Sequence, residues 1–156
     1  MKARDSGMPD AQQWDSFFSP GRALSSLGLS GVHHHAADFG CGYGTFTTPA
    51  AAIISGNIYG FDIDPAMVAA TAGRAKSHGL TNVMTEVRDF LAKGTGLADA
   101  SVDYVMAFNI LHAENPQIIL EEARRILTRN GILAVMHWIY DPTTPRGPRM
   151  EIRPKP

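Results

Sequence analysis

The sequence contains a single cysteine, no long hydrophobic run and almost no net charge. One cysteine, Cys41, cannot form an intramolecular disulfide, and we therefore expect a cytoplasmic protein. No segment approaches the ~18 apolar residues that a membrane helix needs, and residues 1–9 lack the apolar core of a signal peptide. With 14 lysines and arginines against 15 acidic residues, the composition is not that of a nucleic-acid-binding protein. We expect neither a membrane nor a nucleic acid among the partners.

What the sequence does have is an apolar fraction of 44% in 156 residues, enough for one sizeable core. We expect three parts. Residues 1–30 hold a polar arm (1–12) and two short helices with clustered aromatic side chains, 31–140 form the core, and 141–156 form a proline-rich arm. The clustered aromatics are Trp14, Phe17 and Phe18. They either cover a ligand or simply pack into the core, and the sequence alone leaves both interpretations open.

Short apolar runs alternate with helical patterns through the core. The expected strands are 36–39, 57–63, 82–88, 102–110 and 132–139, and the expected helices are 45–54, 65–77 and 116–127. Asp64 is placed to cap the second of these helices, and Asn130-Gly131 to end the third. Strands separated by helices indicate parallel βαβ units, with helices on both faces of one sheet.

The strongest motif follows the first of these strands. Gly40, Gly42 and Gly44 alternate with Cys41 and Tyr43 at a strand-to-helix junction. Glycines there let the backbone turn tightly and approach a ligand closely, and the helix start offers free N–H groups.

The spacing is G-x-G-x-G, whereas dinucleotide-binding proteins have G-x-G-x-x-G. Asp38 precedes the loop; its carboxylate would repel a pyrophosphate and attract an ammonium or sulfonium group. These features favour S-adenosylmethionine over a dinucleotide.

Two further strand ends carry an acidic residue. Asp62, next to Ile63, lies where a carboxylate can accept hydrogen bonds from both ribose hydroxyls, and Met67 can lie under an adenine ring. Asp89 ends the third strand and can accept a hydrogen bond from an adenine amino group, with Phe90 flanking the ring. An ordinary surface acid is the other interpretation of Asp89.

The fourth strand ends in Asn109, followed by Leu111 and His112. This end adjoins the point at which strand order is expected to reverse, where open α/β sheets bind ligands. Backbone groups around Asn109 and Leu111 can reach the methionine part of the cofactor. His112 and Tyr43 border the pocket and are the two candidates for a catalytic base, although a histidine of the pocket wall is the preferred interpretation of His112.

These segments together resemble the class I methyltransferase family. The likeness covers roughly residues 36–140: Asp38 to Gly44 is similar to the family's glycine motif, Asp62 to its ribose-binding acid, Asp89 to its adenine-contacting acid, and Asn109 to His112 to its fourth motif. It implies a Rossmann-like α/β fold with a mostly parallel sheet of order 3-2-1-4-5 and methyl transfer from S-adenosylmethionine. Relative to the family, strands six and seven are expected to be missing, and a homodimer is expected to cover the open sheet edge.

Other sites are less well supported. Neighbouring residues on a strand face opposite sides, so His33, His34 and His35 cannot converge on one ion, and we expect no metal site. Cys41 has no histidine partner in the sequence and is not expected to be a nucleophile.

The sequence therefore predicts an S-adenosylmethionine-dependent methyltransferase with a small-molecule acceptor. The alternatives are a non-catalytic binding module and, third, an NAD-dependent oxidoreductase.

Overall fold

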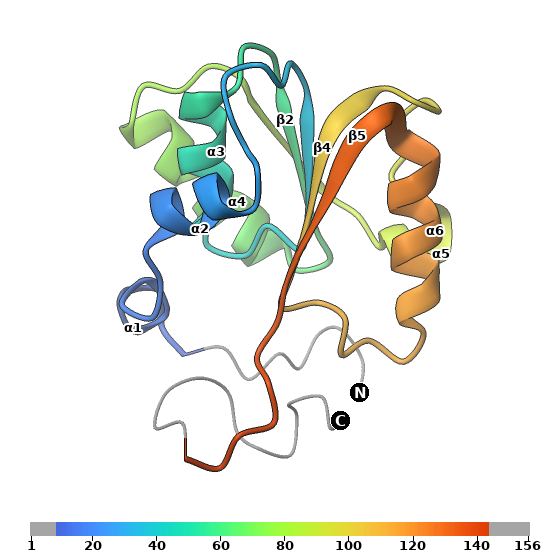
Figure 1. The fold of residues 1–156 in the computed structure, drawn as a ribbon. Coiled ribbons are helices and arrows are strands. Elements are labelled where there is room, and N and C mark those ends of the chain that lie inside the picture. The colour runs from blue at the N-terminus through green and yellow to red at the C-terminus, as the bar shows by residue number, and fades with distance from the viewer. Residues whose placement is uncertain (1–8, 144–156) are drawn as a thin grey trace.

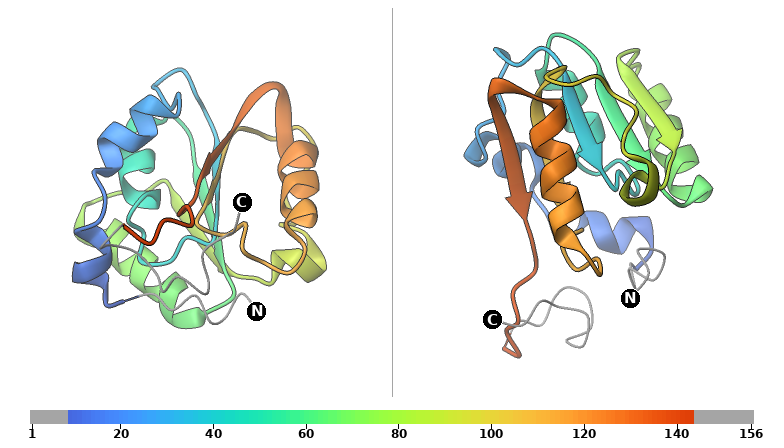
Figure 2. Two further views of the ribbon diagram at one scale, coloured as in Figure 1. Left: turned by 60° about the horizontal axis from the view of Figure 1, so that its bottom comes forward. Right: turned by 90° about the vertical axis from the view of Figure 1, so that its right-hand side faces the viewer.

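The computed structural model describes residues 9–143, and they form a five-stranded sheet with helices on both faces (Figures 1 and 2). The strands are β1 (Ala36–Phe39), β2 (Ile58–Asp62), β3 (Val83–Val87), β4 (Val102–Phe108) and β5 (Leu127–Met136). The helices are α1 (Ala11–Asp15), α2 (Pro20–Ser26), α3 (Thr47–Ile53), α4 (Pro65–Ser77), α5 (Phe90–Lys93) and α6 (Pro116–Ile126).

The strand order is β3-β2-β1-β4-β5, and all four neighbouring pairs are parallel. The expected Rossmann-like order is thereby confirmed. The chain moves outward from β1 in one direction through β2 and β3, then returns to the other side of β1 as β4. The carboxyl ends of β1 and β4 therefore form the switch point at which such sheets bind ligands.

The two faces of the sheet bury separate apolar clusters, because alternate residues of a strand point to opposite sides. Tyr104 and Met106 of β4 pack with side chains of α2 and α3. Val105 and Ala107 pack with α6, whose buried residues include Ile119 and Ile126. Both clusters are continuous across the sheet, so the strand ends are held on a rigid support.

Local signals place α4 as predicted. Asp64 accepts a hydrogen bond from the Ala66 N–H (2.8 Å), Pro65 occupies the first helical position, and Gly79 follows the end of the helix with φ of +67°. These are the expected cap, first-turn and termination residues.

Several boundaries differ from the prediction. The helix expected from residue 45 begins at Thr47, and the arm expected to reach residue 12 is already helical at Ala11. β5 begins at Leu127, directly after α6, and includes Asn130-Gly131. Pairing with β4 accounts for this: Val102 pairs with Leu127 and Tyr104 with Ile132, so the extra residues bulge out without ending the strand.

β5 lies at one end of the sheet, and Val135 on this strand is exposed. The expected homodimer at this edge stays a prediction, which sedimentation velocity would test. Within residues 9–143, no helix is long and apolar enough to span a membrane. Most of the expected proline-rich arm, 141–156, lies outside the described residues.

Candidate functional site

The glycine loop forms a tight turn between β1 and α3. Gly40, Gly42 and Gly44 all have positive φ (79°, 53° and 76°), a region that other residues rarely adopt. A Cβ on Gly44 would lie 3.2 Å from the Thr71 Cα, and one on Gly40 would lie 3.0 Å from the Ile110 side chain. Glycine is thus required both by the backbone conformation and by the neighbouring atoms, and the loop conformation is fixed.

Asp62, at the end of β2, is joined directly to this loop. One carboxylate oxygen accepts the Gly42 N–H (3.0 Å), and the other accepts the Asp64 N–H (3.0 Å). Partial burial raises the pKa of Asp62, although these backbone N–H groups lower it. The structure therefore brings the predicted ribose-binding acid and the glycine motif together, as their spacing had suggested.

The carboxyl group of Asp38 points into the protein. It is only 3% exposed and accepts a 2.6 Å hydrogen bond from the Thr47 hydroxyl of α3. Burial raises its pKa to about 7, with a further contribution from the nearby Asp62. Its direct contact with a bound ammonium group stays a prediction, but the charge of this buried carboxyl group depends on its surroundings near neutral pH.

Helix α4 holds the loop from the other side. The Thr71 hydroxyl, which is fully buried, donates a 2.8 Å hydrogen bond to the Gly42 carbonyl. Cys41 is also buried, beside Gly60 of β2, and burial together with Asp38 raises the pKa of its thiol. A buried thiol of this kind is unreactive, consistent with Cys41 serving the loop through its backbone.

The N-terminal segment with helix α1 is tied to the loop by contacts that the sequence did not identify. Asp15 accepts the Thr45 hydroxyl (2.6 Å) and forms an ion pair with Arg74 of α4. The Tyr43 hydroxyl donates to the Pro9 carbonyl (3.1 Å). Residues 30–59 positions apart in sequence meet here, and this is why a motif search could not find them.

The expected adenine-binding residues surround the ends of β2 and β3. Ile63 and Met67 are half-buried near the start of α4. Asp89 caps α5 by accepting the Ala92 N–H (3.2 Å), and the Phe90 ring packs against Phe39, with ring centroids 4.7 Å apart. Asp89 and Phe90 therefore each have a structural role, and their contacts with adenine stay a prediction.

At the end of β4, Asn109 has φ of +55°, uncommon for a residue other than glycine. Its N–H donates to the Met136 carbonyl at the end of β5 (2.7 Å). Leu111 and His112 follow in the same loop, and the His112 ring lies edge-on to His137, with centroids 5.8 Å apart. His137 was not predicted, because the expected strand continued to residue 139 and placed it inside the sheet.

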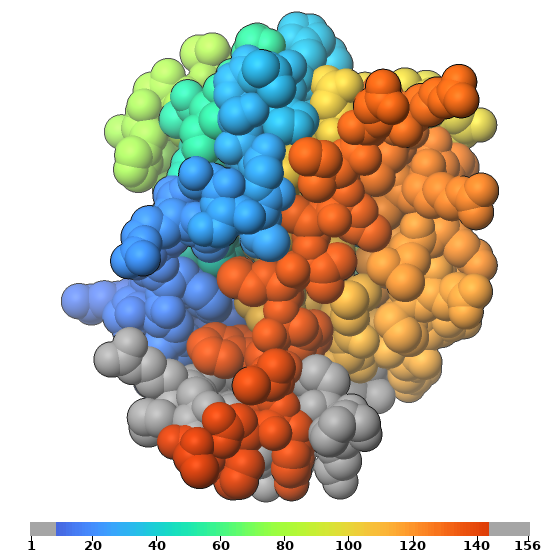
Figure 3. Space-filling model, in the orientation of Figure 1, coloured from blue at the N-terminus to red at the C-terminus, as the bar shows by residue number. Residues whose placement is uncertain are grey.

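Aromatic side chains join the segment after β5 to the N-terminal helices. Trp138, which follows β5, contacts Phe17 and Phe18 with ring centroids 5.8 and 5.7 Å apart. Phe18 also packs on Trp14 and Phe46. Figure 3 shows the segment after β5 crossing the surface between the N-terminal helices and α6. The predicted aromatic cluster is thus part of the core packing, and its role in covering a ligand stays a prediction.

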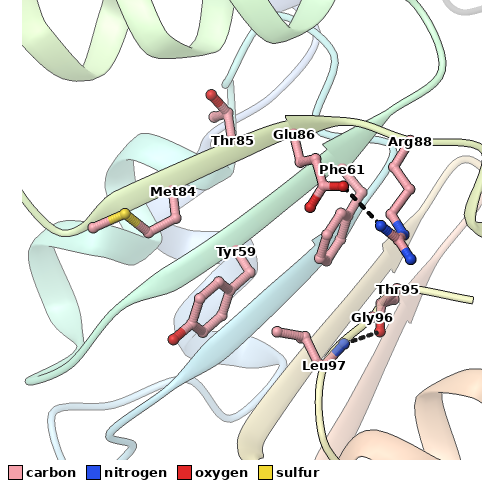
Figure 4. A pocket seen from close by; sticks show the side chains of 9 residues that line it. All are labelled: Tyr59, Phe61, Met84, Thr85, Glu86, Arg88, Thr95, Gly96 and Leu97. Atoms are coloured by element: carbon pink, nitrogen blue, oxygen red, sulfur yellow. Dashed lines mark hydrogen bonds and ion pairs between the residues drawn. The ribbon is translucent and has the colours of Figure 1, made fainter.

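A separate cavity of about 340 Å³ lies over the sheet face at β2 and β3 (Figure 4). Tyr59 and Met84 line it beside the loop that contains Gly96, and an Arg88–Glu86 ion pair lies at one side. No residue of the predicted cofactor site lines this cavity.

The three consecutive histidines have different partners. His33 contacts the Tyr104 ring, His34 hydrogen-bonds Ser55, and His35 accepts the Asn57 N–H. Among residues 9–143 there is no group of three metal-ligating side chains.

Comparison with solved structures gives the same fold. A S-adenosylmethionine-dependent methyltransferase from Aquifex aeolicus is similar, with a TM-score of 0.81 and 23% identity, over 94% of this chain and 77% of that chain. A geranyl diphosphate methyltransferase solved with S-adenosylmethionine has a TM-score of 0.67 and 19% identity, over 85% of this chain and 57% of that one. The [4+2]-cyclase SpnF has a TM-score of 0.67 and 25% identity, over 84% of this chain and 47% of that one. The chain thus spans about half the length of the last two.

No curated protein sequence matches this chain significantly. A family model described as a methyltransferase domain matches residues 32–141, which is more than half of the chain and includes the glycine loop, Asp62, Asp89 and Asn109. On this match, together with the sheet order, the chain belongs to the class I S-adenosylmethionine-dependent methyltransferase family.

Proposed function

We propose that this chain binds S-adenosylmethionine at the carboxyl ends of β1, β2 and β4 and transfers its methyl group to a small-molecule acceptor. The observation that carries the proposal is the hydrogen bond that the Gly42 N–H of the glycine loop donates to the Asp62 carboxylate. Each Asp62 oxygen accepts one backbone N–H, and a carboxylate has lone pairs for further donors, such as the two ribose hydroxyls. The hydrogen-bond acceptors of Asp62 therefore fit the ribose of the cofactor.

The remaining residues of the site fit the other parts of the cofactor. Gly40 and Gly42 let the methionine part approach the backbone, and Asp38 supplies negative charge beneath it that favours an ammonium group. The bound cofactor supplies an electrophilic methyl group on a positively charged sulfur. The chain then has to hold the acceptor in line with that methyl group and exclude water, and orientation of this kind accounts for much of such catalysis.

Calorimetric titration with S-adenosylhomocysteine tests the proposal. We expect Asp62→Ala to weaken binding roughly 100-fold, because two hydrogen bonds to a charged group contribute about 3 kcal/mol or more. Asp64→Ala is the matched control. It removes a neighbouring carboxylate that caps α4, costs stability of about 1 kcal/mol, and leaves the affinity unchanged.

The same titration separates the alternative functions. Binding of NAD, with no binding of S-adenosylhomocysteine, would support an oxidoreductase and overturn the proposal. Binding of S-adenosylhomocysteine with no methyl transfer to any acceptor would leave a non-catalytic module. Equal affinities of the wild type and Asp62→Ala, with both chains folded by circular dichroism, would show that the cofactor does not lie across β2.

A further inference from the structure

His137 lies at the carboxyl end of β5, the strand next to β4. It directly follows Met136, the last residue of β5, whose carbonyl accepts the Asn109 N–H at the end of β4. β1, β4 and β5 are consecutive in the sheet. In the proposed function, the methionine part of the cofactor lies at the ends of β1 and β4. The next position along these strand ends, between β4 and β5, is therefore left for the methyl acceptor.

The hydrogen bonding of His137 fixes which ring nitrogen carries the proton. Nδ1 lies 3.1 Å from the Trp138 carbonyl oxygen. A carbonyl oxygen only accepts hydrogen bonds, so Nδ1 must be the donor, and in the neutral ring Nε2 keeps its lone pair. The ring is thus oriented by its own chain, as an imidazole base has to be.

Nε2 of His137 is buried and has no hydrogen-bond partner among residues 9–143. Leaving a buried polar atom unpaired costs about 1–3 kcal/mol, so native proteins rarely do so without a functional reason. The nitrogen of His137 that can take up a proton is thus left without a partner beside the strand ends at which the methyl acceptor is expected.

His112 adjoins this ring edge-on, with centroids 5.8 Å apart. Burial lowers the pKa of His112, and His137 lowers it further, against a hydrogen bond to the Asn109 backbone that raises it. The lowered pKa favours the neutral form of His112, which adds no positive charge beside His137.

The residue after His137 belongs to an aromatic cluster. Trp138 contacts Phe17 and Phe18, and both phenylalanine rings are partly exposed. Aromatic walls favour a ring or another apolar body, with polar contacts confined to the reacting group.

We propose that His137, through Nε2 and beside His112, accepts the proton of a hydroxyl group on a small, largely apolar methyl acceptor. The inference rests on the proposed function. As the acceptor oxygen forms its bond to the methyl carbon, the carbon–sulfur bond breaks and its electron pair stays on sulfur. The hydroxyl proton passes to Nε2 and then to solvent, and the products are a methyl ether and S-adenosylhomocysteine.

Two acceptors of the same ring size test this role. Phenol must lose a proton on methylation, whereas pyridine is methylated on nitrogen without losing one. His137→Asn retains a side-chain N–H that can donate to the Trp138 carbonyl but has no basic nitrogen. We expect the phenol kcat to fall about 100-fold or more, because general bases contribute factors of this size. The phenol KM and the pyridine kcat should change less than about threefold.

His34→Asn is the control, because His34 is exposed at the opposite edge of the sheet, and we expect both rates to stay at the wild-type values. Equal losses with phenol and pyridine would show a structural role for His137 and overturn the inference, as would an unchanged phenol rate. A wild-type chain that binds S-adenosylhomocysteine but does not methylate phenol would overturn it while leaving the cofactor site standing. No binding of S-adenosylhomocysteine at all would overturn the proposed function and this inference together.

Discussion

The two halves of the sheet's carboxyl edge differ in how completely their polar groups are paired. On the β1–β2 side, Gly42 is bonded through its N–H to Asp62 and through its carbonyl to Thr71, and Asp38 is bonded to Thr47. On the β4–β5 side, Asn109 holds a positive φ and His137 keeps a buried nitrogen unpaired among the described residues. The β1–β2 side, which we call the paired half, therefore has a fixed shape. The β4–β5 side retains backbone strain and a nitrogen that can still accept a proton.

This difference fits a molecule in which the β1–β2 side binds the cofactor and the β4–β5 side takes part in the reaction. A preformed, internally bonded frame binds a ligand without having to reorganise. Strained backbone and unpaired buried groups lower stability and persist where they serve a function. Substitutions in the paired half should therefore change mainly stability and cofactor affinity, whereas the test of His137 concerns the rate of reaction.

The largest effect is expected from Gly44→Ala, which breaks the paired half. A Cβ would be placed at φ of +76° and within 3.2 Å of the Thr71 Cα. The left-handed conformation and the overpacking together cost roughly 2–4 kcal/mol, measured as the free energy of unfolding in urea. Gly73→Ala, in α4 with no atom within 4 Å of the new Cβ, should instead stabilise by about 0.5–1 kcal/mol. Equal effects of the two changes would contradict a tightly packed loop.

Asp38→Asn should have the next largest effect, visible as a change in the pH dependence of stability. The folded-state pKa of about 7 lies above the usual 3.8, so the folded state binds more protons between these values. The stability that protonated Asp38 contributes is complete below about pH 4 and is lost as the pH rises through 7.

In Asp38→Asn this loss should disappear, so the difference between wild type and variant changes by roughly 2 kcal/mol from pH 5 to 7. Urea unfolding across this range measures it. The affinity for S-adenosylhomocysteine should fall in Asp38→Asn, because an amide does not balance the ligand's ammonium charge. A parallel pH profile of wild type and Asp38→Asn would show that Asp38 is already ionised in the fold.

Local sequence was sufficient where short-range chemistry decides the structure. The cap at Asp64, Pro65 and the terminating Gly79 define α4, and alternating glycines after an apolar strand define the loop. The position of Asp62 near this loop was also predictable, because neighbouring parallel strands end at the same side of the sheet.

Prediction failed where pairing between distant segments decides. Asn130-Gly131 is a typical turn, yet pairing with β4 keeps both residues inside β5. That same pairing ends β5 at Met136 and so places His137 at the strand end, where the sequence pattern had continued the strand. The partners Thr47, Thr71 and Arg74 have no local signal, since each contacts a residue that only the fold brings near.

The smallest effect concerns the link between α1 and the paired half. Arg74→Met removes the ion pair with Asp15, in which both side chains are about a quarter to a third exposed. Such pairs contribute about 0–1 kcal/mol, so binding of S-adenosylhomocysteine should weaken at most about fivefold, and hydrogen exchange around Trp14 should accelerate. Lys76→Met, at an exposed position of the same helix, should change neither quantity. Faster exchange in Arg74→Met without any loss of affinity would mean that α1 packs on the core without covering the cofactor, and with that result the aromatic cluster of Trp14, Phe17 and Phe18 would serve the core alone.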